Sequence, residues 1–133
     1  MPTRDSIPPG TLDMLILKTL ARHRPMHGFE IADVIQQISE EVLQVEEGSL
    51  YPALQRMLIK GWILGEWGKT SENRKARYYT LTRAGRKQLE SELESYGRVN
   101  AAIARILEPY DHLRTLPPHW FPAPPAPPRR RPR

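Results

Sequence analysis

The order of hydrophobic patterns along the chain restricts its fold more than any other feature of the sequence. Three segments in which apolar residues recur at helical spacing come first, and a stretch of alternating residues interrupted by a polar turn follows them. A fourth segment with helical spacing ends near residue 107. Three helices followed by a hairpin is the plan of a winged helix-turn-helix, so the sequence predicts a mainly α fold with a small β-hairpin and an added C-terminal helix.

The first predicted helix begins after Thr11, a suitable N-cap residue, and runs to about Arg22. Its apolar residues are Leu12, Met14, Leu15, Ile16, Leu17 and Leu20. Because they point to more than one side of the helix, they indicate burial by a second chain as well as by the domain's own core. Pro25 ends this segment, and a second helix is expected from Gly28, with an apolar stripe formed by Ile31, Val34 or Ile35, and Ile38.

The third predicted helix spans Glu47 to Lys60 and ends at Gly61, a residue type that favours the left-handed conformation just past a helix. Pro52 is compatible with this helix if it lies near the start, where backbone N–H groups lack partners in any case. The face opposite the apolar one carries small, hydrogen-bonding and cationic groups and no acid. We expect it to hold Ser49, Ala53, Arg56 and Lys60, flanked by Tyr51 and Gln55.

A hairpin is predicted from Trp62–Trp67, a polar turn at Lys69–Arg74 and a second strand at Lys75–Leu81. Trp62 and Trp67 are expected in the hairpin core, and stacking against a ligand is the alternative role for them. Alternation puts one set of second-strand residues on one face (Arg77, Tyr79, Leu81) and another set on the opposite face (Ala76, Tyr78, Thr80).

The charge distribution predicts one positive edge. The net charge of +5 owes much to four arginines in the last 17 residues, but a local cluster of bases also occurs between Lys69 and Gln88, with Glu72 as its one acid. Residues 30–47, in contrast, hold acids and no base. Lysine and arginine neutralise phosphates and release counterions, so Arg74, Lys75 and Arg77 are candidate phosphate contacts in the hairpin.

A last helix is predicted after Thr82, which is placed to cap it. Its apolar seam follows a heptad pattern through Leu89, Leu93, Tyr96, Asn100, Ile103 and Leu107, and such seams pack against another helix. Asn100, a polar residue within the seam, can fix register and partner number.

Four stretches resemble the PadR family of transcriptional regulators, in the same order and at the same spacing. They are Gly10–Leu17 (GTLDMLIL), Met26–Ala32 (MHGFEIA), Gly48–Leu54 (GSLYPAL) and Tyr78–Gly85 (YYTLTRAG), and the resemblance extends from about Gly10 to Leu107. The short C-terminal helix is similar to that of the smaller PadR subfamily. The proline- and arginine-rich tail has no counterpart in the family pattern.

The resemblance implies a homodimeric repressor that binds an inverted-repeat operator in double-stranded DNA. It also implies that the last helix packs against the first helix of the partner, so the dimerisation residues would be Leu12, Leu15 and Ile16 together with the heptad seam. The helix with the Leu-Tyr-Pro motif would enter the major groove, which maps DNA contacts onto Ser49, Tyr51, Gln55 and Arg56; the exposed face adds Lys60.

Several alternatives remain open at this stage. The cationic face of the third helix could be an ordinary solvated surface, and Tyr51 could pack under the hairpin. Tyr96, assigned to the dimer seam, could instead contact a small aromatic effector, because some small PadR relatives bind flat aromatic compounds at the dimer centre. A winged helix can also bind a protein rather than DNA, although the basic hairpin favours DNA. A dimer whose main role is sensing a small molecule is a third function to consider.

Other residues exclude further functions. The chain has no cysteine, its four histidines (His23, His27, His112, His119) have no metal-ligand spacing, and no catalytic triad or acid pair is recognisable. We therefore expect no enzyme activity, metal or cofactor. Without an apolar run long enough for a membrane span or a signal peptide, the expected compartment is the cytoplasm.

The predicted organisation has four parts. An N-terminal arm covers residues 1–10, the winged helix-turn-helix 11–81 and the dimerisation helix 82–108. Residues 109–133, rich in proline and arginine, form a tail that we expect to be disordered, with arginines that could add nonspecific affinity for DNA.

Overall fold

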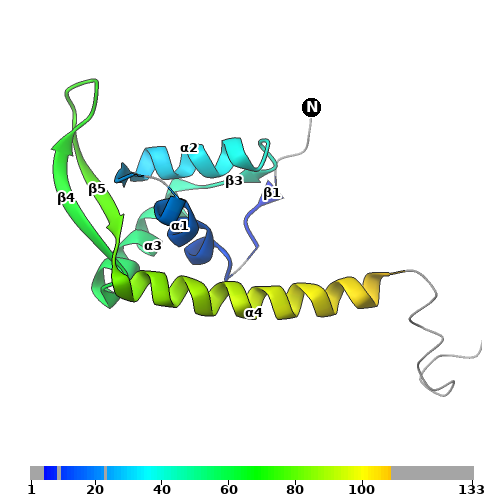
Figure 1. Cartoon of the computed structure of the whole chain (residues 1–133). Coiled ribbons are helices and arrows are strands. Elements are labelled where there is room, and N and C mark those ends of the chain that lie inside the picture. The colour runs from blue at the N-terminus through cyan, green and yellow to red at the C-terminus, as the bar shows by residue number, and fades with distance from the viewer. Residues whose placement is uncertain (1–4, 9, 23, 109–133) are drawn as a thin grey trace, which may run out of the picture. The chain divides into compact units, whose positions relative to one another are not determined.

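The computed structural model describes residues 5–8, 10–22 and 24–108 (Figure 1). Its elements in chain order are β1 (Asp5–Ser6), α1 (Leu12–Arg22), β2 (Met26–His27), α2 (Gly28–Ile38), β3 (Leu43–Gln44), α3 (Glu47–Lys60), β4 (Ile63–Lys69), β5 (Lys75–Leu81) and α4 (Arg83–Leu107). The predicted winged helix-turn-helix with a small hairpin and a C-terminal helix is therefore confirmed. The predicted tail lies outside the described residues.

The chain divides into two compact units, Met1–Tyr96 and Gly97–Arg133. The first contains strands β1 to β5, helices α1 to α3 and the first part of α4. In the second, residues 97–108 are described, and they continue α4 up to Leu107. Within the described residues, none of the helices is long and apolar enough to cross a bilayer.

The hairpin belongs to a three-stranded antiparallel sheet with the order β2-β5-β4. Its two long strands pair from Ile63 opposite Leu81 to Lys69 opposite Lys75, and we call residues 63–81 the wing. Figure 1 shows the β4–β5 turn of the wing projecting beyond β2 and the start of α2. The short strand β2 pairs with β5 through His27 opposite Tyr78 and thereby ties the start of α2 to the wing. A separate parallel pair joins β1 to β3.

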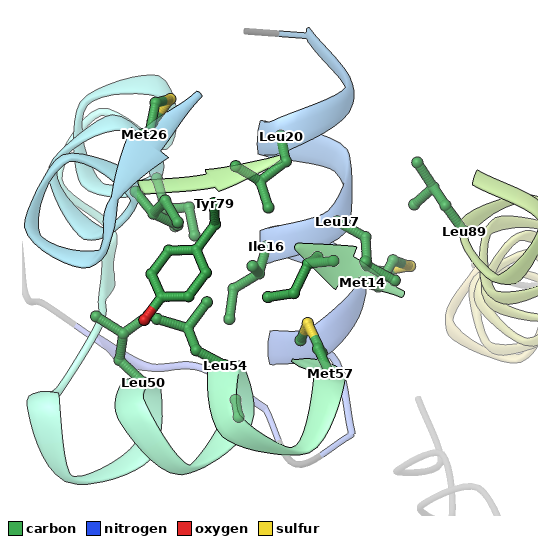
Figure 2. Close-up of a cluster of buried hydrophobic side chains, with 14 residues drawn as sticks. Met14, Ile16, Leu17, Leu20, Met26, Leu50, Leu54, Met57, Tyr79 and Leu89 are labelled. Atoms are coloured by element: carbon green, nitrogen blue, oxygen red, sulfur yellow. The ribbon is translucent and has the colours of Figure 1, made fainter. Parts of the chain in front are cut away.

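The core lies between the first three helices and the sheet. Seven large side chains are less than 2% exposed and occupy its centre: Ile16, Leu17, Ile31, Leu50, Leu54, Met57 and Ile63. Figure 2 shows the ring of Tyr79, from β5, beside Leu50 and Leu54 of α3, so the wing strand is anchored in the core through this residue. Leu89 of α4, 5% exposed, points toward Met14 and Leu17 of α1.

Helix ends agree closely with their sequence signals. Gly61 has a φ of 76°, and the N–H group of Trp62 donates to the carbonyl of Met57, which closes α3 as predicted. Thr82 caps α4 by accepting a hydrogen bond from the N–H of Gly85 at 3.0 Å, and its hydroxyl donates to the carbonyl of Gly61 at 2.7 Å.

Helix α2 has a cap that the sequence reading overlooked. His27 accepts the backbone N–H of Glu30 through Nδ1, and the Glu30 carboxylate accepts the N–H of His27, which together form a capping box. In α3, Pro52 is the sixth residue, farther along the helix than a first-turn proline. Because proline lacks an N–H group, the helix forgoes one internal hydrogen bond at that point.

Candidate nucleic-acid interface

The outward face of α3 carries the residues predicted to contact DNA. Its exposed residues from 49 onward are Ser49, Tyr51, Pro52, Gln55, Arg56, Ile59 and Lys60. The prediction that Ala53 lies on this face is wrong, because Ala53 is 0% exposed and packs in the core with Leu50, Leu54 and Met57. Ile59, 77% exposed, belongs to the surface that the sequence reading had not assigned. A helical projection centred on Gln55 would have found it, since Ile59 follows one turn later.

Arg56 does not extend freely from α3. Its Nη2 atom donates to Oδ1 of Asp13, in α1, at 2.9 Å, and about half of the Arg56 side chain remains exposed. A partly exposed pair of this kind contributes at most about 1 kcal/mol to stability. Its main effect is geometric, because it holds the guanidinium against α1 in the absence of a ligand.

The partly buried carboxylate of Glu92 lies in the electrostatic environment of this pair. Burial raises the pKa of Glu92, in α4, and the negative charge of Asp13 raises it further, whereas a hydrogen bond from Gln88 and the charge of Lys60 lower it. The Oε2 atom of Glu92 is buried without a hydrogen-bond partner among the described residues. The Nζ atom of Lys60 itself lies 4.6 Å from the centre of the Trp62 ring, so this lysine covers an aromatic surface at the end of α3.

The wing presents the predicted cations in two different ways. Arg74 lies at the tip with an 82% exposed side chain, 3.9 Å from a Glu72 carboxylate oxygen. Lys75 is also exposed, whereas Arg77 is only partly exposed and its Nε atom is buried against the sheet. A Cβ atom at Gly65 would collide with Arg77 Nε, so the glycine opposite Tyr79 makes room for this guanidinium.

Trp67 differs from the sequence prediction. It was expected in the hairpin core, but it is 64% exposed. Trp62, in contrast, is partly buried and packs against the core. The ring of Trp67 lies beneath two cations, with Lys75 Nζ 4.9 Å and Arg77 Cζ 5.8 Å from its centre. Alternation along a short strand indicates which residues share a face, but it does not show whether another element covers that face.

A groove separates the wing from the N-terminal ends of α2 and α3. It has a volume of about 790 Å³ and is bordered by His27, Gly28 and Phe29 of α2 and its cap, by Tyr51 of α3, and by wing residues that include Trp67, Arg74, Lys75, Arg77 and Tyr79. Tyr51 packs close to Gly28, since a Cβ atom there would lie 3.1 Å from Tyr51 Cε1. One groove therefore joins the start of α3 to the cations of the wing. Burial raises the pKa of the Tyr79 phenol on its floor, although the charge of Arg77 partly opposes that shift.

The predicted dimerisation residues occupy different environments. Ile16 is 0% exposed inside its own chain and is a core residue, which corrects its assignment to a dimer surface. Leu12 and Leu15 are partly buried. Leu89, 5% exposed, is also a core residue of its own chain, which corrects its assignment to the dimer seam as well. Farther along α4, apolar residues are exposed: Leu93 38%, Tyr96 47%, Val99 55%, Ile103 49%, Ile106 77% and Leu107 76%. Asn100 is exposed as well. Val99 and Ile106 widen the predicted seam.

His27 is engaged in the cap of α2 and has no metal-ligand arrangement around it. Across the described residues, no three His, Cys, Asp or Glu side chains are grouped closely enough to hold a metal ion. His23, His112 and His119 lie outside the described residues.

Comparison with known proteins gives a family match. The model of the transcriptional regulator PadR-like family matches residues 16–91, which contain α2, α3, the wing and most of α1. A Lysinibacillus sphaericus protein named "Uncharacterized protein X" is 30% identical over 105 residues, which are 79% of this chain and 95% of that protein.

Solved structures of similar fold are regulators. A PadR-like transcriptional regulator from Bacillus cereus is 30% identical with a TM-score of 0.64, and the alignment covers 76% of this chain and 95% of that one. A PadR family transcription regulator from Clostridium difficile is 29% identical with a TM-score of 0.62, covering 74% of this chain and 100% of the other.

Proposed function

The chain belongs to the PadR-like family of transcriptional regulators, and from this premise we propose that it represses transcription as a homodimer bound to an inverted-repeat operator. Members of this family are DNA-binding regulators rather than enzymes. In the proposed complex, α3 lies in the major groove, where Ser49, Tyr51 and Gln55 are exposed for contact with DNA. Arg56 also contacts DNA once its hydrogen bond to Asp13 is broken. Lys60 contacts DNA at the C-terminal end of α3.

The observation that carries this proposal is the continuity between α3 and the wing. Tyr51, at the start of α3, and the wing residues Arg74, Lys75 and Arg77 border the same groove. Helix residues in a major groove can read base edges, whereas lysine and arginine of a wing neutralise phosphates. In this proposal α3 therefore supplies sequence specificity, and the wing supplies affinity for DNA of any sequence.

The proposed dimer rests on the exposed apolar residues of α4. Six of them between Leu93 and Leu107 are at least 38% exposed, and an apolar helix face of this kind is typical of a protein interface. We propose that this face, with Leu12 and Leu15, packs against a second copy. Two-fold symmetry then requires an operator whose half-sites are centred about 10 base pairs apart, or a multiple of that spacing.

We also propose that the repressor works in the cytoplasm and that a flat aromatic effector releases it from DNA. The support for the effector is the exposed ring of Tyr96 on the proposed interface, since aromatic faces stack on one another. Titration of candidate compounds into the operator complex, with Tyr96→Ala as the control, tests this part. Compounds that release the native protein should fail to release the variant.

The whole proposal is tested by selection of DNA. The purified full chain is incubated with fragmented genomic DNA from its host, and the retained fragments are sequenced and footprinted. We expect enrichment of one inverted repeat and protection of two symmetric half-sites. Retention of all fragments in proportion to their abundance would refute operator recognition, and failure to retain DNA at any salt concentration would favour a protein-binding winged helix.

A further inference from the structure

Trp67 is the most exposed aromatic ring of the wing. It is 64% exposed, whereas Tyr79 on the same sheet is 6% exposed and is part of the core. A large apolar ring on a projecting hairpin contributes little to the core of its own chain. Its exposed surface is therefore available to a partner.

The register of the wing determines what surrounds this ring. Trp67 lies directly opposite Arg77, and directly paired residues of antiparallel strands project from the same side of the sheet. Lys75 is two residues from Arg77 and lies on that side as well. Both cations approach the indole, at 4.9 Å and 5.8 Å from its centre, so ring and charges form one composite surface.

The charged and aromatic residues of the groove indicate what kind of partner can bind there. Three cations border it, Arg74, Lys75 and Arg77, against the single acid Glu72. Apolar rings line it too, among them Phe29, Tyr51 and Trp67. A partner that combines negative charge with apolar surface at short intervals matches this lining. The sugar–phosphate backbone of DNA has that composition, because each phosphate is followed by the apolar face of a deoxyribose.

We propose that the groove receives the backbone of one strand of duplex DNA, with the indole of Trp67 packed against a deoxyribose and Lys75 and Arg77 directed to neighbouring phosphates. This inference rests on the proposed DNA-binding function and adds a contact that is not electrostatic. Since every nucleotide carries the same sugar, Trp67 strengthens binding to all sequences and does not select among them.

The salt dependence of binding separates this contact from charge neutralisation. Trp67→Ala removes apolar contact but no charge, so operator affinity should fall about tenfold per half-site, the loss expected for roughly 60 Å² of apolar surface. The slope of log affinity against log salt should stay unchanged. Lys75→Ala should instead lower that slope by about one unit per half-site. Trp67→Phe should retain most of the affinity.

Leu64→Ala is the matched control. Leu64 belongs to the same strand as Trp67, is 61% exposed and lies on the opposite side of the wing, opposite Thr80. This variant should bind DNA like the native chain. Thermal unfolding of each variant verifies that the wing still folds.

Four outcomes would overturn the inference. Native affinity in Trp67→Ala would show that the indole makes no contact. If Trp67→Ala lowered the salt slope as much as Lys75→Ala does, Trp67 would act only by positioning Lys75 and Arg77. Stronger binding to single strands, with the larger Trp67→Ala loss there, would indicate base stacking instead. If the native chain binds no duplex at all, the proposed function itself fails, which is a separate result from a native chain that binds DNA without using Trp67.

Discussion

The guanidinium of Arg56 and the carboxylate of Asp13 join the outward face of α3 to α1 through a hydrogen bond of 2.9 Å. For Arg56 to reach DNA, this bond must be exchanged for a contact with a phosphate or a base. Asp13 therefore competes with DNA for the arginine, and it adds a negative charge close to a surface that we propose binds a polyanion.

Asp13→Asn should consequently tighten DNA binding, and the slope of log affinity against log salt should become steeper by about one unit per half-site if Arg56 then reaches a phosphate. Arg56→Ala should cost about 1–3 kcal/mol on the operator and relax preference at one base position. Titrations of both variants on operator and random duplex measure these effects. Weaker binding by Asp13→Asn would show that the pair positions α3 rather than restrains Arg56.

Arg77→Ala should weaken operator and random duplex alike and lower the salt slope by about one unit, because a wing cation contacts phosphates and not bases. Lys87→Ala removes an exposed cation of α4 outside the groove and is the control. If Arg77→Ala weakened operator binding alone, Arg77 would have to contact a base.

Two glycines inside α4 should respond in opposite ways to alanine. At Gly85 a Cβ atom would collide with the backbone carbonyl of Trp62, so Gly85→Ala should lower the free energy of unfolding by about 2 kcal/mol. At Gly97 a Cβ atom meets nothing within 4 Å, and Gly97→Ala should raise it by about 1 kcal/mol through helix propensity. Denaturant unfolding measures both. A destabilising Gly97→Ala would indicate that a second chain lies close to this glycine.

Glu92→Gln tests the partly buried carboxylate of Glu92 through the pH dependence of stability. Because burial raises the folded-state pKa of Glu92 above its ordinary value of 4.5, the folded chain holds the proton more tightly than the unfolded chain. The stability contributed by that proton is complete below pH 4.5 and is lost as the pH rises through the folded-state pKa. Glutamine is neutral throughout, so the variant should be the more stable chain at pH 7 and the advantage should disappear below pH 4.5. Lower stability of Glu92→Gln at pH 7 would contradict this.

Ile103→Glu should yield a monomer by placing a charge on the proposed interface of α4, where Ile103 is 49% exposed in the single chain. Ala101→Glu introduces the same charge at an exposed position on the side of α4 opposite Ile103 and should leave the dimer intact. Light scattering at micromolar concentration distinguishes the two masses. A native chain that is already monomeric would refute the dimer.

Most of the fold could be predicted because its long elements carry strong local signals. The periodicity of α3 and the glycine after it located both ends of that helix, and Thr82 marked the start of α4. The short strands were missed because two residues, such as Met26–His27, show no periodicity. They form through pairing with residues distant in the sequence.

The candidate site was less predictable, since its arrangement depends on contacts between elements. Nothing local to Arg56 indicates that its partner is Asp13, 43 positions away. Ala53 and Trp67 also show that burial is hard to predict from the sequence. Ala53, a small residue next to a polar face, is buried, whereas Trp67, a large apolar residue, is exposed. Burial depends on what packs above a face, which periodicity does not report.

The Thr82 hydroxyl has a mechanical consequence. It bonds the carbonyl of Gly61, just after α3, and the amide of Gly85, in the first turn of α4, and so adds a side-chain link to the backbone bond from Thr82 to Trp62. If the start of α4 rotates, the end of α3 must rotate with it or these hydrogen bonds must break, at a cost of about 0.5–1.5 kcal/mol each. A rotation at the start of α4 is therefore transmitted to the end of α3, the helix that we propose reads DNA.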